Sequence, residues 1–373
     1  MAEHYIGLMS GTSLDGVDGV LLALEGATVQ VLASAAVPLP ESLRDAFLTL
    51  NHSGPDELHR AQQAAHALVG LYAQVVHSLL DQSGLPPEAV QAIGAHGQTV
   101  RHVPPGVAHS TPYTLQLNQP ARLAELTGIT VVADFRSRDV AAGGQGAPLV
   151  PAFHRKVFAT PGMSVAVANV GGIANVTALT ADGRVFGLDT GPGNALMDEW
   201  CQRHTGQRYD DAGRWARSGT SDPALLQRLL AEPYFSQHGI KSTGRDLFHL
   251  GWLEQHLQQT PPLQPQDVQA TLLQLTARTL ADGIQNIDWG ASPPSRLLVC
   301  GGGALNAALL DALAGALPTL QVGTTAALGW PVMQVEAAAF AWLAQRCLHG
   351  LPGNEPQVTG ARGPRILGAI YPA

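Results

Sequence analysis

The sequence predicts an α/β protein made of two related halves. The chain has 373 residues, and at about 150 residues per domain this length suggests two domains. Two separate segments, 5–24 and 163–179, share one pattern, in which a glycine-containing turn joins two apolar runs typical of strands. Elsewhere apolar residues recur with helical spacing. Strands and helices therefore alternate along the chain, and the repeated pattern indicates two domains of similar design.

The first of these segments contains a loop with the residue types of a phosphate site. Apolar runs at 6–9 and 17–24 predict the two strands, and the turn between them is expected to need glycine dihedrals at Gly11 and Gly16. Backbone N–H groups, two hydroxyls and one carboxylate suit phosphate oxygens together with a hard cation. An ordinary hairpin loop explains the same composition equally well. The residues concerned are Gly11, Thr12, Ser13, Leu14, Asp15, Gly16, Val17 and Asp18.

Two common nucleotide motifs do not fit this chain. Gly11 and Gly16 have the spacing of a Walker loop, but Val17 stands where that loop has lysine, and no helix follows. Gly301 and Gly303 begin a dinucleotide fingerprint whose third glycine position holds Asn306. The sequence therefore disfavours both a Walker ATPase and an NAD enzyme.

Further glycine clusters follow strands in the second half of the chain. One predicted strand, 185–188, leads into the run 189–194, which opens with Asp189. A buried strand at 296–300 leads into Gly301, Gly302 and Gly303, and a helix starts after them. Glycine loops at several strand ends, two of them in hairpins that resemble each other, suggest two halves that grip one nucleotide between them.

The remaining elements place other polar residues at strand ends. A strand at 90–95 leads into His96, and a buried strand at 129–133, preceded by a helix at 120–127, delivers Asp134 where open α/β sheets bind ligands. The glycine-rich run 141–147 is expected to be a hinge or cleft loop, and 358–371 to be a strand that returns to the first domain. A long helix is predicted at 55–82, with an apolar face of Leu58, Ala61, Ala65, Leu68, Tyr72, Val76 and Leu79. Other helices are expected at about 194–204, 222–231, 246–258, 265–288, 304–316 and 331–348.

Composition narrows the possible classes of protein. The formal net charge is −8 with only 21 Lys and Arg residues, which argues against a nucleic-acid partner. Cys201, Cys300 and Cys347 lie far apart, without zinc spacing, and are expected to be reduced core thiols of a cytoplasmic protein. The start of the chain lacks a signal pattern, and no apolar run approaches a membrane span. The oligomeric state stays open, a homodimer included.

Several polar residues have both a structural and a functional interpretation. A lone histidine after a strand, such as His96, is more often structural than functional. Asp134 and Arg136 could form a structural ion pair, and Asp189 could cap a turn. Glu336 interrupts an apolar helix, so its carboxylate either faces solvent or is placed for function.

Taken together, the motifs resemble one family along nearly the whole chain. The segments that carry this resemblance are 7–18, 96–102, 133–136, 143–154, 169–175, 189–194, 301–306 and 335–342. In them the chain resembles the anhydro-N-acetylmuramic acid kinases, a branch of the superfamily that includes actin, hexokinase, acetate kinase and the heat-shock chaperone ATPase. The run 115–120 departs from the family pattern, which has an Ile-Gly-Asp-Pro-like sequence there.

The resemblance implies a fold and a reaction. The fold would be the two-domain actin-like or sugar-kinase (ribonuclease H-like) α/β fold, with its active site in the interdomain cleft. The expected domains are 1–130 plus 358–373, with the first phosphate loop, and 131–357. The enzyme would use ATP, Mg²⁺ and water to open the 1,6-anhydro ring of 1,6-anhydro-N-acetylmuramic acid and phosphorylate O6. The products would be N-acetylmuramic acid 6-phosphate and ADP, as in peptidoglycan recycling.

The resemblance also implies roles for particular residues. Asp189 matches the catalytic base, residues 11–18 match the phosphate loop, and Asp15 would be the magnesium partner. The second phosphate loop would comprise Gly171, Gly172 and Asn175, and the adenosine would be bordered by Gly301, Gly302, Gly303 and Asn306. Candidates for holding the sugar are His96, Gln98, Arg101, Asp134, Arg136 and Glu336. Two alternatives stay open: a kinase of the same fold for a non-anhydro sugar or a carboxylate, and a non-enzymatic ATP-driven clamp.

Overall fold

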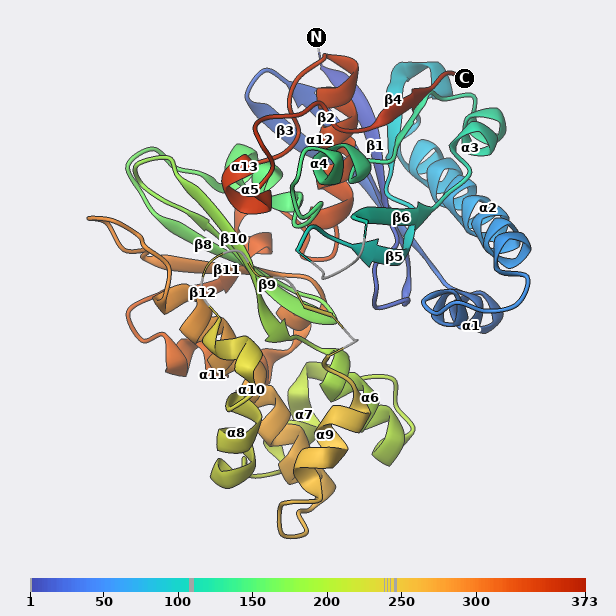
Figure 1. The fold of residues 1–373 in the computed structure, drawn as a ribbon. Coiled ribbons are helices and arrows are strands. Elements are labelled where there is room, and N and C mark those ends of the chain that lie inside the picture. Colours follow the sequence, from blue (N-terminus) through green and yellow to red (C-terminus); the bar gives the residue numbers. More distant parts are fainter. Residues whose placement is uncertain (1, 107–110, 238, 240, 242, 245–246) are drawn as a thin grey trace. The chain divides into compact units, whose positions relative to one another are not determined.

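A computed structural model describes residues 2–106, 111–237, 239, 241, 243–244 and 247–373 (Figure 1). The chain divides into two compact units. Unit 1 comprises Met1–Val157 and Gln334–Ala373, and unit 2 comprises Phe158–Met333. The chain therefore passes between the units at two points, after Val157 and after Met333.

Unit 1 contains a six-stranded sheet in the order β13-β7-β4-β1-β2-β3. The three strands β1, β2 and β3 form an antiparallel meander, and β1 pairs in parallel with β4, which pairs in parallel with β7. The predicted first hairpin and the strand before His96 are thus confirmed. The strands are β1 (Glu3–Met9), β2 (Gly16–Glu25), β3 (Thr28–Pro38), β4 (Val90–Ala95), β7 (Val131–Ala133) and β13 (Ala369–Tyr371), and a separate hairpin joins β5 (Gln98–Val103) to β6 (Tyr113–Leu117).

Glycines allow helix α12 to lie directly against the sheet of unit 1. Gly7 and Gly94 are register partners on β1 and β4. A Cβ atom on Gly7 would lie 1.8 Å from the carbonyl oxygen of Ala337, and one on Gly94 would lie 2.0 Å from that of Phe340. The helix backbone therefore occupies the space that side chains would fill. The helices of unit 1 are α1 (Glu41–Leu50), α2 (Glu57–Ser83), α3 (Pro120–Thr127), α4 (Ser137–Ala141), α5 (Val150–Phe158, whose last residue falls in unit 2), α12 (Val335–Leu348) and α13 (Pro356–Thr359).

The other face of this sheet packs against the long helix α2. A Cβ on Gly19 of β2 would lie 2.2 Å from a methyl group of Val75, so this contact is also close. The predicted apolar face of α2 is confirmed at Leu68 and Tyr72, which are fully buried. Leu58 was wrongly placed on that face: it is 86% exposed, because the helix begins only at Glu57 and its first turn extends beyond the sheet.

The units differ from the expected domain boundaries at 130/131 and 357/358. Strand β7 pairs with β4 and β13, which ties the chain beyond residue 130 to the first sheet. Helix α12 packs on β1 and β4 and so belongs to the same unit. The segments 131–157 and 334–357 therefore lie in unit 1. The run 141–147, expected to be a hinge, lies inside this unit and away from both crossing points, so the division of the chain does not support that role.

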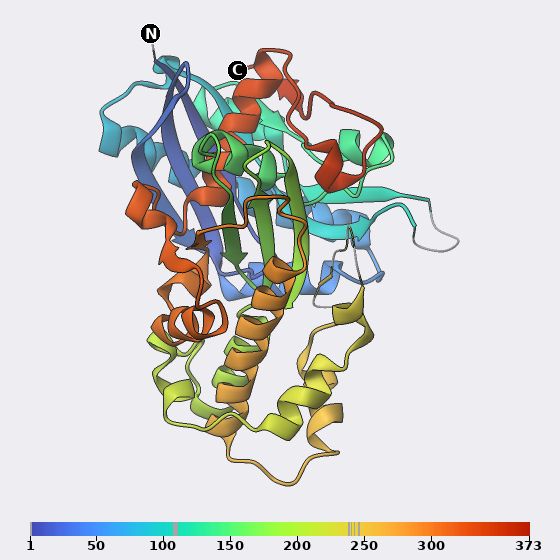
Figure 2. The ribbon, with the colours of Figure 1, turned by 90° about the vertical axis from the view of Figure 1, so that its left-hand side faces the viewer.

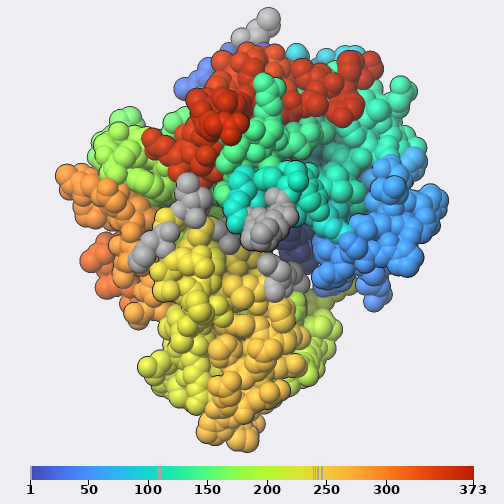
Figure 3. Space-filling view, viewed as in Figure 1, coloured from blue at the N-terminus to red at the C-terminus, as the bar shows by residue number. Residues whose placement is uncertain are grey.

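The C-terminal segment is not the continuous strand expected at 358–371. It begins with the short helix α13, continues without regular structure, and forms only the three-residue strand β13. Figure 3 shows this segment, in red, on the surface of unit 1 against the blue-green segment that precedes α5. The amide of Gln145 donates to the carbonyl of Thr359 at 2.7 Å, which joins the two segments.

Unit 2 repeats the strand arrangement of unit 1. Its sheet has the order β10-β9-β8-β11-β12, again an antiparallel meander followed by parallel strands. The expected relation between the two halves is confirmed by this shared order. The strands are β8 (Val165–Val170), β9 (Ile173–Leu179), β10 (Val185–Pro192), β11 (Arg296–Cys300) and β12 (Gln321–Thr324).

Helix α10 is the main helical support of the unit 2 sheet, and it packs against β9 and β10 (Figure 2). Its buried residues join one core with the strands, among them Leu275 and Leu280, both fully buried. The predicted helices of unit 2 are confirmed with shifts in their ends, and the short helix α7 (Arg214–Arg217) was not predicted. The confirmed helices are α6 (Ala195–Thr205), α8 (Pro223–Leu230), α9 (Leu250–Leu257), α10 (Pro265–Gln285) and α11 (Ala307–Ala316).

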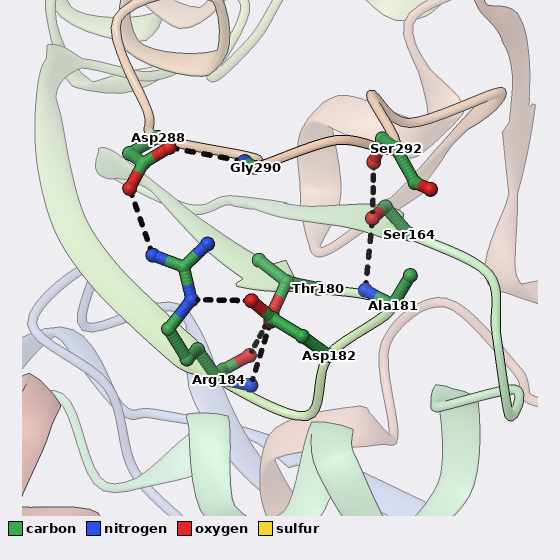
Figure 4. Close-up of polar contacts among 8 residues, drawn as sticks. All are labelled: Ser164, Thr180, Ala181, Asp182, Arg184, Asp288, Gly290 and Ser292. Atoms are coloured by element: carbon green, nitrogen blue, oxygen red, sulfur yellow. Dashed lines mark hydrogen bonds and ion pairs between the residues drawn. The ribbon is translucent and has the colours of Figure 1, made fainter.

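The turn between β9 and β10 is held by polar contacts, as Figure 4 shows. Arg184 donates to Asp182 and to Asp288, both at 2.8 Å. The hydroxyl of Ser164, a residue only 3% exposed, donates to the carbonyl of Ser292 at 2.6 Å and accepts from the amide of Ala181 at 3.0 Å. Ser164 precedes β8, whereas the candidate glycine turn follows it, so these contacts lie at the opposite end of the strand.

Two expectations from composition can be compared with the structure. The three cysteines are free thiols and all are buried, as expected of core residues. Among the described residues, no helix has the length and apolarity needed to cross a membrane.

The contact between α12 and the sheet gives a testable prediction. Gly94→Ala should lower the free energy of unfolding of unit 1 by at least about 2 kcal/mol, because the new methyl group must displace the α12 backbone. Denaturant unfolding of the full chain would measure this loss. Gly70→Ala is the matched control: Gly70 lies inside helix α2 with nothing within 4 Å of an added Cβ, so this variant should gain roughly 0.5–1 kcal/mol. Equal effects of the two variants would contradict the close packing.

Candidate functional site

The first candidate loop joins β1 to β2, but its backbone differs from the prediction. Neither Gly11 nor Gly16 has a positive φ; the left-handed residue is Leu14, with φ 59°. The amide of Leu14 closes the turn on the carbonyl of Gly11 at 3.2 Å, and burial of the Leu14 side chain holds it there. Gly16 is needed for another reason, since a Cβ would lie 2.7 Å from the carbonyl oxygen of Val37 on β3. Within the loop, Thr12 and Asp15 are exposed.

Beside this loop, the charges of two carboxylates raise the pKa of a third. Asp18 lies on β2, and its pKa is raised to about 6, first by burial, then by the charge of Glu336 and finally by that of Asp15. Glu336 is in the first turn of α12 and is half-buried. The structure therefore places Glu336 close enough to Asp18 for its charge to raise the pKa of Asp18, whereas sequence periodicity left the position of Glu336 open. A bound cation would relieve this repulsion.

His96 and Arg136 form a second group in unit 1. Arg136 Nε donates to His96 Nε2 at 3.0 Å, and His96 Nδ1 bonds the carbonyl of Gly97 at 2.7 Å. Burial, and then the charge of Arg136, lower the pKa of His96 to about 3. His96 is thus a neutral imidazole, which donates from Nδ1 and accepts at Nε2. A second Arg136 nitrogen, Nη1, donates to the carbonyl of Gly146 at 2.8 Å.

The other sugar candidates of unit 1 have separate surroundings. Gln98 is buried and accepts a hydrogen bond from the hydroxyl of Ser10, which ties β5 to the end of β1. Arg101 forms an ion pair at 2.6 Å with Glu57, the first residue of helix α2, so a carboxylate already balances its charge. Asp134 is exposed, directly after β7, with φ 58°. Of these three residues only Asp134 is exposed, and the roles of all three in holding a sugar stay predictions.

The segment 115–120, whose sequence departs from the family pattern, has a structural role. The side chain of Asn118 donates to the carbonyl of Ala95 at 3.2 Å, just ahead of His96. Its carbonyl oxygen accepts from the amide of Gln119 at 2.9 Å. Asn118 thus holds the end of β4 from which His96 projects.

The glycine turns of unit 2 lie against one another. A Cβ on Gly193 would lie 2.3 Å from the carbonyl oxygen of Gly171, and one on Gly303 would lie 2.4 Å from the side chain of Val170. The amide of Gly193 also donates to the carbonyl of Gly172 at 2.9 Å. Sequence analysis assigned these glycines to separate loops, and the structure brings the loops into direct contact.

Asp189 and Asn175 face each other across two strands. They are register partners on β10 and β9, and Asn175 is also the partner of Asn169 on β8. Because directly opposed residues point to the same face of a sheet, these three polar side chains form a row across it. Asp189 lies within β10, which extends to Pro192, instead of following the strand as predicted.

Residues that sequence analysis missed hold Asp189 in place. The amide of Thr243 donates to its carboxylate at 3.0 Å, and its carbonyl accepts from the hydroxyl of Tyr234 at 2.8 Å. Lys241 lies over the Tyr234 ring at 4.7 Å. Burial lowers the pKa of Lys241, whereas the charge of Asp189 acts in the opposite direction. The one available signal was that Lys241 is one of only two lysines in the chain.

Asn306 has a clear structural role. Its side chain caps helix α11 by accepting from the amide of Leu309 at 3.1 Å, as Asn commonly does at this position. A Cβ on Gly213 would lie 2.3 Å from the same oxygen, so the cap is also closely packed. The predicted contact with adenosine therefore stays a prediction.

The described residues contain no cluster of three or more His, Cys, Asp or Glu side chains able to hold a metal ion. Asp15 is nevertheless an exposed carboxylate beside two hydroxyls, a donor set that suits Mg²⁺ when phosphate oxygens and water complete the shell. A surface hollow of about 340 Å³ in unit 2, lined by Arg217, Gln274 and Asp311 among others, contains none of the candidate residues.

The chain thus has two α/β units whose sheets share one topology, and each unit has a glycine turn between two of its strands. A family model described as anhydro-N-acetylmuramic acid kinase matches residues 3–373. The chain belongs to this family. A relative of that name from Bordetella petrii is 59% identical, over 99% of this chain and 96% of its own. Another, from Ralstonia nicotianae, is 54% identical, over 100% and 98%.

Solved structures resemble the chain only distantly. The activator of 2-hydroxyisocaproyl-CoA dehydratase from Clostridium difficile, with bound ADPNP, is 12% identical with a TM-score of 0.44, over 91% of this chain and 93% of its own. A ROK family glucokinase from Streptomyces griseus, in complex with glucose and AMPPNP, is 16% identical with a TM-score of 0.39, over 91% and 99%.

The acidic group of unit 1 gives a pH prediction. The pKa of Asp18 is raised from 3.8 to about 6, so the folded state holds a proton that the unfolded chain releases between these pH values. Stability contributed by the protonated form is therefore lost as pH rises through 6. At about 1.4 kcal/mol per pKa unit, Asp18→Asn should gain roughly 2–3 kcal/mol at pH 8 and clearly less at pH 5.

Urea unfolding at the two pH values would measure this difference. Asp81→Asn, at an exposed position of helix α2, is the control and should change stability little at either pH. A gain for Asp18→Asn that is the same at pH 5 and pH 8 would contradict the raised pKa of Asp18, which burial causes first and the charges of Glu336 and Asp15 increase.

Proposed function

We propose that this protein is an ATP-dependent kinase that opens the 1,6-anhydro ring of 1,6-anhydro-N-acetylmuramic acid with water and phosphorylates O6. The products are N-acetylmuramic acid 6-phosphate and ADP. Membership in the family supports the reaction, and the observation that carries the residue roles is the arrangement around Asp189. The three free thiols accord with a cytoplasmic enzyme of cell-wall recycling.

Asp189 is proposed as the general base. Water is a poor nucleophile, so its attack on C1 needs a positioned acceptor for the proton, a contribution of about 10²–10⁴-fold. The backbone of Asp189 is held on both sides, by the Tyr234 hydroxyl and by the Lys241 carbonyl, to which the Asp189 amide donates at 3.2 Å. The Thr243 amide then orients the carboxylate. A fixed carboxylate on a rigid strand suits this role.

The phosphate groups of ATP are proposed to meet the glycine turns of both units. In unit 1 these are residues 11–18, and in unit 2 they are Gly171, Gly172 and Asn175. Gly301–Gly303 and Asn306 would border the adenosine. Phosphoryl transfer needs mainly alignment and neutralisation of charge, which backbone N–H groups and a cation provide. When bound, Mg²⁺ would neutralise charge on the transferred phosphoryl group, with Asp15 as its protein partner.

The sugar is proposed to bind near His96 and Arg136. A neutral imidazole and a guanidinium provide a hydrogen-bonding and a cationic group, which suits a sugar that carries a carboxylate. Gln98, Asp134 and Glu336 are the other proposed contacts. Arg101 is retained only as a weaker candidate, because Glu57 already pairs with it.

The first prediction from this proposal concerns the base. Asp189→Asn should keep the fold and ATP binding but lower turnover by about 10²–10⁴-fold, because the amide cannot accept the proton of water. Asp182→Asn is the control, at an exposed carboxylate beyond the far end of the same hairpin, and should keep full turnover. Near-normal turnover by Asp189→Asn would move the base to Asp134 or Glu336.

Isotope labelling would separate this reaction from that of an ordinary sugar kinase. In ¹⁸O-water, one labelled oxygen should appear at C1 for each phosphoryl group transferred, while O6 keeps its original oxygen. The reaction should be stopped before exchange and examined by NMR. Turnover without label at C1, or label in the phosphate ester bridge, would leave only a generic kinase of this fold.

The second prediction concerns the cation. Chelation of Mg²⁺ should abolish turnover, and Asp15→Ala should have nearly the same effect, because no lysine takes the place of the metal in this loop. Asp81→Ala, which removes an exposed carboxylate from helix α2, should leave both turnover and the Mg²⁺ requirement unchanged. Full activity of Asp15→Ala at low Mg²⁺ would refute the assignment of the loop.

A further inference from the structure

We propose that the buried carboxylate of Asp139 is a positioning residue for sugar binding, which acts on Arg136 and His96 through the loop Gly143–Gly146. The inference rests on the proposed function, because it assigns this pair of residues to the sugar. Asp139 is in helix α4 and is 0% exposed. A fully buried carboxylate is unfavourable unless several donors bind it, so its surroundings indicate what it is for.

Asp139 accepts hydrogen bonds from two distant parts of unit 1. Its Oδ2 accepts from the amide of Gly146 at 2.9 Å. Its Oδ1 accepts from the side chains of Asn354 at 2.7 Å and Thr359 at 2.8 Å. The carboxylate therefore joins the glycine loop to the C-terminal segment, and bonds to an ionised acceptor are stronger than neutral ones.

The loop is shaped to surround this carboxylate. A Cβ on Gly144 would lie 2.2 Å from Asp139 Oδ2, so only glycine allows the approach. Gly143 and Gly146 have positive φ values of 85° and 70°. The amide of Gln145 donates to the carbonyl of Thr359 at 2.7 Å, which holds the loop from the other side.

Gly146 connects the carboxylate to the sugar residues. Its N–H is held by Asp139, and its carbonyl accepts from Arg136 Nη1 at 2.8 Å. Arg136 Nε in turn donates to His96 Nε2 at 3.0 Å. A shift of Gly146 would therefore move the guanidinium, and the guanidinium fixes the orientation of the neutral imidazole. Asp139 itself touches neither Arg136 nor His96 through these bonds, so its role is to position them.

A purely structural role would show itself differently. If Asp139 only fastened the C-terminal segment, its loss would lower stability and affect both ligands alike. If it positions Arg136, its loss should weaken binding of the sugar and leave binding of ATP intact. Binding constants for the two ligands, measured separately on the full chain by calorimetry, distinguish these roles without any turnover.

The main variant is Asp139→Asn, which keeps the volume but has a single acceptor oxygen and so cannot serve both sides. Its Kd for the anhydro sugar should rise roughly 10- to 100-fold, as expected when binding groups are misplaced. Its Kd for ATP should stay within about twofold. In a background of Arg136→Lys, the same change should add no more than about twofold, because the two residues act in one chain of contacts.

Two further variants complete the test. Thr359→Val removes one donor to Asp139 and leaves the bond between Asp139 and Gly146, so it should raise the sugar Kd by only roughly fivefold. This variant tests the inference if Asp139→Asn fails to fold. Ser164→Ala removes a buried hydroxyl with two hydrogen bonds in unit 2, at the opposite end of β8 from the glycine turn. It should lower the melting temperature and leave the sugar Kd unchanged.

The outcomes separate this inference from the proposed function. Failure of the wild-type chain to bind the anhydro sugar contradicts the proposed function. Binding by the wild type, with an unchanged sugar Kd in both Asp139→Asn and Thr359→Val, overturns only the inference. Equal weakening of sugar and ATP binding by Asp139→Asn also overturns it. So does a double variant, Asp139→Asn with Arg136→Lys, whose fold-change in sugar Kd equals the product of the two single fold-changes.

Discussion

The close contact of helix α12 with the sheet is the constraint on which the rest of unit 1 depends. Gly7 and Gly94 are paired across β1 and β4, and without side chains they let the helix backbone reach the sheet. The helix then brings Glu336 to the loop that follows β1, and Phe340 to within 4.7 Å of the His96 ring. The acidic group and the histidine group thus take their places from one packing interaction.

Burial then shifts the pKa values of these two groups in opposite directions, and each shift favours the neutral form. His96 is buried and lies beside a guanidinium, and both its burial and the neighbouring positive charge favour its neutral form. Asp18 is partly buried and its neighbours are carboxylates, so burial and the neighbouring negative charges again favour the neutral form. Unit 1 therefore contains a neutral imidazole beside a guanidinium and, separately, a group of carboxylates in which the pKa of Asp18 is raised. These two groups match the two kinds of substrate that the proposed reaction requires.

Unit 2 uses the same strand order for a different task. Its meander carries a row of polar side chains, Asn169, Asn175 and Asp189, across neighbouring strands. Gly193 and Gly303 have no side chains, and a Cβ at either position would collide with the neighbouring turn or strand end. The two units therefore share one sheet topology, while the residues near the ends of their strands differ. Function in this fold depends on those end residues more than on the frame.

The sequence by itself determined the class of fold, the two hairpins that begin at β1 and β8, and the longer helices, because these depend on local periodicity and on glycine and proline signals. It also indicated the glycine loops and Asp189, since these follow or end strands in the chain. Tertiary structure alone decided that Leu14, instead of Gly11 or Gly16, has the left-handed backbone, because burial of its side chain fixes the turn. It alone decided that helix α12 and the run 131–157 belong to unit 1, since pairing between distant strands sets that boundary. The tertiary structure alone also decided the partners of two polar residues. Lys241 contacts Tyr234 in a stretch without a periodic pattern, and Asp139 accepts hydrogen bonds from Gly146 and from the distant Thr359. No local sequence pattern indicates which partner a buried polar group will have.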